Sequence, residues 1–235
     1  MSYRPSPTWS LVEPPPPVEI AADLLGLAAA ALESPIEPGL NRREQDRARR
    51  RQLAVAHACA RAIDWTAMHW FWFEGGLEWE RRHDGAAHEV RADQRANPTI
   101  PTAVKREVLA RDGYRCRYCR IRVVTSPALT KLEELLPAAL PMWPAERGPA
   151  EVVTHSAQSV MRLTWDHVVP RSVGGGNTAE NVVVSCGTCN YMKGSCTLEE
   201  LSLRNPFDRD PLPAPGWDGL DGRLGSRRIS SPPTA

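Results

Sequence analysis

The sequence predicts an α+β protein, in which a mainly helical N-terminal region precedes a small unit of short strands and helices held by a structural metal. Before residue 64, apolar residues recur at three- and four-residue steps, as on one face of a helix. Later, short β-prone runs at 160–165 and 182–184 lie between two Cys-x-x-Cys pairs. The 235 residues fit one moderate domain with additions or two small ones. The 24% of charged residues and the net charge of +1 exclude a supercharged protein and an acidic disordered one.

The N-terminal region is predicted to consist of a tail, two helices and an aromatic segment. Residues 1–17 and 206–235 hold six prolines each and are interpreted as disordered tails. Within 18–98, a region of unknown role, one helix covers Val18–Leu32 and a longer one begins at the N-cap Asn41 and ends near Ile63. Its inward-facing residues are Leu53, Ala56, Ala60 and Ile63. Six arginines at 42–51 form either a phosphate-binding surface or a solvated face. The aromatic segment 65–79 is read as a hairpin or a small core.

The second unit is predicted to cover residues 99–205. Two X-Pro pairs ending at Pro98 and Pro101 mark its start, because a residue before proline avoids helical geometry. A helix begins with Thr102 as its N-cap and ends at Gly113. A proline-rich insertion occupies about 126–159, and the two β-prone runs follow it. Residues 197–200 match a capping box and predict a last helix.

Four cysteines have the spacing of a metal site. Cys116-x-x-Cys119 and Cys186-x-x-Cys189 place four thiolates around one tetrahedral zinc, which accepts a closed sulfur shell without redox chemistry. The alternative, four unrelated buried thiols, does not account for the doubled spacing. Cys59 and Cys196 lie outside the pattern.

Between and at these knuckles the chain reads Asp166-His167-x-x-Pro170, Gly174-Gly175, Asn181 and Cys189-Asn190-x-x-Lys193-Gly194. This pattern resembles the HNH endonuclease family over roughly residues 102–203. The resemblance implies a ββα-metal fold in which a divalent ion and one histidine hydrolyse a DNA phosphodiester. It implies that the family's characteristic residues are His167, Asn181 and Asn190, with Asn181 bracing the loop that carries His167. Asn190 stands where some members carry a third histidine, and an oxygen ligand there favours magnesium or manganese.

The chemistry of phosphodiester hydrolysis assigns roles to the same residues. His167 is neutral near pH 7 and can act as general base toward a water molecule. In an extended strand Asp166 points to the opposite side, so it is expected to bind the catalytic ion. Asn190 supplies a second oxygen ligand, and Lys193, three residues later on a helix, is expected to hold a phosphate.

Charge placement supports a nucleic-acid substrate. Between Lys105 and Arg122 there are seven basic residues against two acidic ones, an excess of five. We expect DNA contacts from Lys193, Arg171, Arg115 and Arg117. The alternative is that some of these arginines balance the net charge of −2 on a four-thiolate zinc centre.

The sequence therefore predicts a metal-dependent DNA endonuclease with structural zinc and catalytic magnesium or manganese. A non-catalytic zinc module that binds nucleic acid or protein is the main alternative, and a toxin or defence nuclease held by an inhibitor protein is another. No apolar run approaches the length of a membrane span and no secretory signal is recognisable, so a cytoplasmic location without membrane contact is expected. The oligomeric state and the specificity for DNA sequence, or for DNA over RNA, leave no mark in the sequence.

Overall fold

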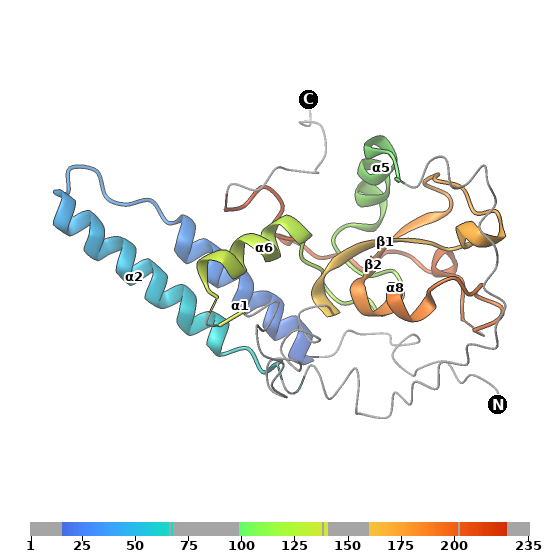
Figure 1. Ribbon diagram of the computed structural model, residues 1–235, viewed down its shortest axis with the longest axis horizontal. Coiled ribbons are helices and arrows are strands. Elements are labelled where there is room, and N and C mark those ends of the chain that lie inside the picture. Colours follow the sequence, from blue (N-terminus) through green and yellow to red (C-terminus); the bar gives the residue numbers. More distant parts are fainter. Residues whose placement is uncertain are drawn as a thin grey trace.

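The computed structural model describes residues 16–65, 67, 99–137, 139–140, 160–201 and 203–224. Figure 1 shows two long helices at one end of the molecule and a unit with a small sheet at the other. The elements are α1 (Pro16–Glu33), α2 (Arg42–Arg61), α5 (Thr102–Asp112), α6 (Ser126–Leu135), β1 (Leu163–His167), η3 (Arg171–Val173), β2 (Val182–Cys186), α8 (Gly187–Lys193) and η4 (Pro206–Asp208). This architecture confirms the predicted α+β class. None of the helices in these ranges is long and apolar enough to span a bilayer.

The helices α1 and α2 form an antiparallel hairpin (Figure 1). Their facing sides are rich in alanine, including Ala28 and Ala29 of α1 and Ala56 and Ala60 of α2, all with no exposed surface. Asn41 is the N-cap of α2, as predicted, and a capping box with Glu44 fixes the start of the helix. Leu53 was expected to face inward but is 38% exposed, because α1 covers only a narrow strip of α2 and Leu53 lies beyond its edge.

The sheet consists of two antiparallel strands. Leu163 pairs with Cys186 at one end and His167 with Val182 at the other. Every residue of β2 is buried, because α5 and α8 both pack against this strand. The second cysteine pair therefore begins at the buried end of β2 and continues into the first turn of α8.

Two helix boundaries differ in detail from the sequence prediction. Thr102 is the first residue of α5 rather than its N-cap, which is Pro101, and the helix ends at Gly113 with a positive φ of 64°. At residue 197 the capping-box contacts form between Thr197 and Glu200, with distances of 2.7 and 3.2 Å. Only a turn follows them, so no last helix is present at 198–201.

The predicted disordered tail at 206–235 is wrong for residues 206–224. Trp217 donates from Nε1 to the Val123 carbonyl at 3.0 Å, and the Arg122 guanidinium lies over its ring. Leu220 is 2% exposed. At the end of the segment, Arg223 pairs with Glu33 of α1 at 3.0 Å. Residues 206–224, which we call the strap, are rich in proline and contain little regular secondary structure. A few large side chains nevertheless anchor the strap to the core.

The hairpin is attached to the second unit through α1. Glu19 accepts from Arg115 at 3.1 and 3.2 Å and pairs with Arg122 at 2.8 Å. Arg122 also contacts Asp23 at 2.7 Å. The two units therefore share one charged interface instead of being joined only by a linker.

Several predictions fall on residues outside the described part. These are the tails at 1–15 and 225–235, the aromatic segment beyond Trp65 and most of the proline-rich insertion at 141–159. The described part of the insertion contains α6, whose Ala128, Leu129 and Leu132 are buried. α1 begins at Pro16, two residues inside the predicted N-terminal tail.

Candidate functional site

The four knuckle cysteines meet at one point. Their Sγ atoms all lie within 4.8 Å of one another, and all four residues are buried. Cys119 Sγ and Cys186 Sγ are 3.8 Å apart, which matches the roughly 3.8 Å between sulfurs in a tetrahedral zinc site with Zn–S bonds of about 2.3 Å. The cysteines therefore suit a structural metal such as zinc, and the sequence prediction of this cluster is confirmed.

Local backbone contacts shape each knuckle. In the first, the Cys116 N–H donates to the Ile121 carbonyl and the Arg120 N–H donates to the Cys116 carbonyl, both at 2.9 Å. Arg120 adopts a positive φ of 67°, which closes the turn. In the second, Cys186 is the N-cap of α8, and its Sγ accepts from the Cys189 N–H at 3.3 Å.

The thiols of this cluster carry strongly shifted pKa values. Burial raises the pKa of Cys119, Cys186 and Cys189. Burial acts the same way on Cys116, but hydrogen bonds from the other three thiols outweigh it and lower the Cys116 pKa. A buried group of this kind ionises fully only when a cation compensates its charge, and a zinc ion would do so.

Asp166 lies on the interior side of β1. It is 3% exposed, and its Oδ2 accepts from the Tyr118 hydroxyl at 2.5 Å. Lys193 of α8 is equally buried and places its Nζ 3.4 Å from the same carboxylate and 2.7 Å from the His167 carbonyl. Burial raises the pKa of Asp166 to about 6, although the charge of Lys193 and the Tyr118 hydrogen bond both oppose the shift.

This arrangement changes two expectations. Lys193 was expected to hold a phosphate, but its side chain has no exposed surface, because α8 turns it toward β1. Asp166 was expected to be an open metal ligand, but it already pairs with Lys193 and Tyr118, because strand alternation directs it toward the zinc knuckle. Among the residues that the structure describes, only the four cysteines form a cluster of three or more potential ligands.

His167 lies on the other side of β1 and is half-buried. Its Nε2 is 2.7 Å from Oδ1 of Asn177. The Asn177 side-chain nitrogen donates to the Thr99 carbonyl at 3.3 Å, so its oxygen faces the imidazole and accepts a hydrogen bond from the Nε2–H group. Burial lowers the pKa of His167, and the charge of Arg171 adds to this effect while Asn177 opposes it. The imidazole is thus held in one orientation, with Nδ1 as the acceptor nitrogen.

The loop between β1 and β2 is closed by Asn181. Its Oδ1 accepts from the Val169 N–H at 2.8 Å, and its Nδ2 donates to the carbonyls of Val169 and Gly176 at 3.1 and 3.0 Å. Gly175 sits inside this closure, where a Cβ would lie 1.7 Å from the Val169 carbonyl oxygen. Any side chain at 175 would therefore open the loop that leads away from His167.

Asn190 lies on α8, beside β1. It is partly exposed, and its Nδ2 is 3.4 Å from the Trp165 carbonyl. Asn190 and Lys193 thus both extend from α8 toward β1. The Asn190 side chain is partly exposed, whereas the Lys193 side chain is buried.

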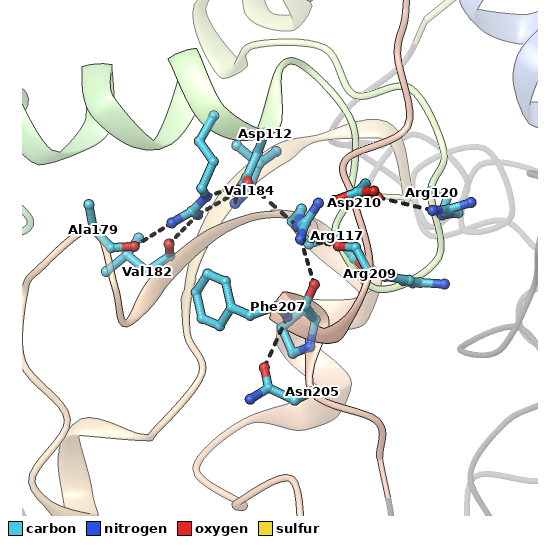
Figure 2. A network of polar contacts seen from close by, with 12 residues as sticks. Asp112, Arg117, Arg120, Ala179, Val182, Val184, Asn205, Phe207, Arg209 and Asp210 are labelled. Atoms are coloured by element: carbon cyan, nitrogen blue, oxygen red, sulfur yellow. Dashed lines mark hydrogen bonds and ion pairs between the residues drawn. The ribbon is translucent and has the colours of Figure 1, made fainter.

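Two of the arginines expected to contact DNA are used inside the fold. Arg115 pairs with Glu19 and donates to the Arg120 carbonyl at 2.8 Å. Arg117, in the network of Figure 2, lies 3.5 Å from Asp112 and donates to the carbonyls of Pro206 and Arg209 at 2.6 and 2.7 Å. Burial lowers the pKa of Arg117, although Asp112 opposes the shift. Arg171, on η3, remains partly exposed near His167.

Three residues of the site region were missed in the sequence. Tyr118 stands inside the first knuckle and connects it to Asp166. Asp112, 2% exposed, accepts from the Val184 N–H at 3.0 Å and pairs with Arg111, so it joins α5 to β2. Asn177 follows the three glycines of the loop, and an asparagine at that place was the available signal for a partner of His167.

Comparison with known proteins gives one match. Residues 156–205 match the model of the HNH endonuclease family. This range includes β1, the loop closed by Asn181, β2 and α8, but not the first knuckle. No curated protein and no solved structure matches the chain. The match confirms the resemblance and indicates a nuclease-type function that acts on nucleic acid.

Proposed function

We propose that this chain, whose residues 156–205 are of the HNH endonuclease type, hydrolyses DNA phosphodiester bonds with His167 as general base. The observation that carries the proposal is the contact between His167 Nε2 and Asn177 Oδ1, at 2.7 Å. Here the partner fixes the tautomer and leaves the lone pair of Nδ1 for a proton.

His167 is suited to this role at neutral pH. Burial lowers its pKa below the ordinary value of 6.5, so the imidazole is neutral at pH 7 and can accept a proton from a water molecule. As the proton reaches Nδ1, the imidazolium that forms keeps its Nε2 hydrogen bond to Asn177. Asn181 and Gly175 hold the loop that brings Asn177 to the ring.

A divalent cation would be held by Asp166 and Asn190. Carboxylate and amide oxygens are the ligands that magnesium and manganese prefer. Asp166 is 3% exposed and pairs with Lys193 at 3.4 Å, so an ion would bind its carboxylate only after Lys193 moved away. When bound, such an ion would neutralise charge on the phosphate that is being cut. Lys193 then competes with the ion for Asp166.

The zinc knuckle would position the site rather than take part in the reaction. Tyr118 belongs to the knuckle and donates to Asp166, so a correctly folded first knuckle holds one side of β1. Zinc-bound thiolates require a reducing environment, which fits the proposed cytoplasmic location.

The alternative is a zinc module that binds nucleic acid or protein without cutting. The closed pair of Asp166 and Lys193 favours it, because a zinc scaffold can use such a pair for stability alone. The oriented His167 argues against it.

Incubation of the full chain with supercoiled plasmid and roughly 5–10 mM magnesium or manganese, enough to saturate weak oxygen sites, distinguishes the nuclease from the non-catalytic zinc module. The proposed nuclease nicks the plasmid, and His167→Ala slows nicking by about 10²–10⁴-fold. His57→Ala, a histidine on α2 distant from β1, serves as the matched control and leaves nicking unchanged. Salt-dependent binding without nicking under any of these conditions would favour the zinc module.

A further inference from the structure

The basic residues of the described ranges differ in whether the fold already engages them. Arg115, Arg117 and Arg122 are engaged with carboxylates or carbonyl groups inside the fold. The arginines in the first half of α2 are all exposed, and none of them makes a hydrogen bond or ion pair; they are Arg42, Arg43, Arg47, Arg49, Arg50 and Arg51. Among the residues that the structure describes, exposed arginines are therefore densest on α2.

Three of these arginines form a stripe along α2. Arg43, Arg47 and Arg50 follow each other at steps of four and three residues, so they lie above one another on one side of the helix. This side is opposite to Ala56 and Ala60, which pack against α1. The stripe is about 10 Å long at 1.5 Å per residue. We refer to these three residues as the arginine stripe.

Of the two acidic side chains near the stripe, one is engaged elsewhere and the other is partly buried. Glu44 is turned back into the capping box, where its Oε2 accepts from the Asn41 N–H at 2.9 Å. Asp46 is partly buried; it lies three residues after Arg43 and four before Arg50, so it offsets one of the three positive charges of the stripe. Guanidinium groups spaced along one side of a helix suit the oxygens of successive phosphates better than lysines do, because each can bind two oxygens at once.

The helical hairpin is also fixed relative to the unit that contains β1, the strand of His167. Glu19 and Asp23 tie α1 to Arg122, and Glu33 at the other end of α1 pairs with Arg223. Figure 1 shows that the first turns of α2 lie at the end of the molecule away from β1. A polyanion that contacts both places must therefore be extended and stiff, as duplex DNA is.

We propose that the arginine stripe binds the phosphate backbone of duplex DNA at a distance from the bond cut at His167. The proposal rests on the proposed function and names the surface that holds its substrate. Such contacts carry no sequence information, so they add affinity equally for all duplexes.

The test measures how salt affects binding of the full chain to a fluorescent 40-base-pair duplex (a length of roughly 136 Å at 3.4 Å per base pair). All proteins carry His167→Ala, and no divalent metal is added, so the DNA stays intact. The stripe variant is Arg47→Gln with Arg50→Gln. The matched control, called the flank control, is Arg42→Gln with Arg49→Gln; it removes the same charge from the same helix but from another side, the line spaced by seven residues that continues to Ala56. Thermal melting checks that both variants fold.

The stripe variant is expected to reduce the slope of log affinity against log salt by about two, one for each lost phosphate contact. Its affinity at 0.1 M salt falls roughly 60-fold relative to the unsubstituted stripe, and the difference vanishes near 1 M. The flank control changes the slope by less than one, and Arg47→Lys with Arg50→Lys keeps most of the affinity.

Equal losses in the stripe and flank variants, or an unchanged slope in both, would overturn the proposal. The plasmid assay is separate from this result. If the chain nicks plasmid but the stripe variant binds DNA like the wild type, the nuclease proposal stands and the DNA-binding role of the stripe is wrong. If the stripe variant loses affinity but the chain does not nick plasmid, the DNA-binding role stands and the nuclease proposal is wrong.

Discussion

Replacing Lys193 with methionine tests whether this lysine is a structural partner of Asp166 or a phosphate-binding group. Methionine is close to lysine in length but has no charge and no donor. The change removes the ammonium that lies 3.4 Å from Asp166 and donates to the His167 carbonyl at 2.7 Å. Because both partners are almost fully buried, water does not replace the lost contacts.

The expected loss is large for a single substitution. Removing one partner of a buried ion pair costs about 3–5 kcal/mol, against a total stability of about 5–15 kcal/mol for a typical domain. For a chain of this size the melting temperature then falls by roughly 6–20 °C. A lysine that held only an external phosphate would leave the melting temperature nearly unchanged.

The pH dependence gives a second readout. The folded-state pKa of Asp166, about 6, lies above the ordinary value of 3.8, so this carboxyl destabilises the fold progressively as the pH rises through that interval. Lys193 opposes this shift, so its removal raises the pKa of Asp166 further and extends the interval above pH 6. The stability gap between wild type and Lys193→Met is therefore small at pH 5 and largest at pH 8.

Thermal melting of four proteins at pH 5 and pH 8 measures these effects: wild type, Lys193→Met, Asp166→Asn and the double variant. The double variant is expected to be more stable at pH 8 than Lys193→Met alone, because it no longer buries an uncompensated carboxylate. Equal melting of Lys193→Met and wild type at pH 8 would refute the buried pair.

Three further substitutions test other parts of the structure. Cys186→Ser should release one equivalent of metal, measured by elemental analysis, and unfold the second unit, since structural zinc supplies on the order of 10–16 kcal/mol; a folded variant that retains zinc would contradict the four-cysteine site. Asn181→Ala should lower stability by about 2–3 kcal/mol in denaturant unfolding, as three hydrogen bonds are lost, and should reduce nicking; wild-type nicking would contradict its bracing role. Trp217→Ala should cost about 3 kcal/mol in the same assay, and no change would show that 206–224 is not part of the core.

The sequence was a good guide where local rules decide the structure. The capping residues Asn41 and Glu44 set the start of α2, and the doubled cysteine spacing located the metal cluster. Alternation along β1 correctly separated Asp166 from His167. These features depend on neighbours a few residues away, which the sequence displays directly.

Features that depend on distant partners could not be predicted in this way. Lys193 was placed on the right helix, but its direction depends on the packing of α8 over β1. The role of the Arg117 guanidinium depends on its contacts with Asp112 and with the carbonyl groups of Pro206 and Arg209. The composition of residues 206–224 resembles that of a disordered tail, and contacts with residues far away in the sequence, such as Trp217 with Val123 and Arg223 with Glu33, hold the segment in place.

The central claim is that His167 is the base of a DNA nuclease, and the pH profile of plasmid nicking by wild type and His167→Ala tests it most directly. With magnesium or manganese present, the wild-type rate should rise from pH 5 and level off at a lower pH than a free histidine would give, because burial lowers the pKa of His167 from 6.5 and the neutral imidazole is the active form. His167→Ala should be slower by about 10²–10⁴-fold at pH 7 while it keeps its zinc and its melting temperature. Nicking by His167→Ala at the wild-type rate would contradict the account.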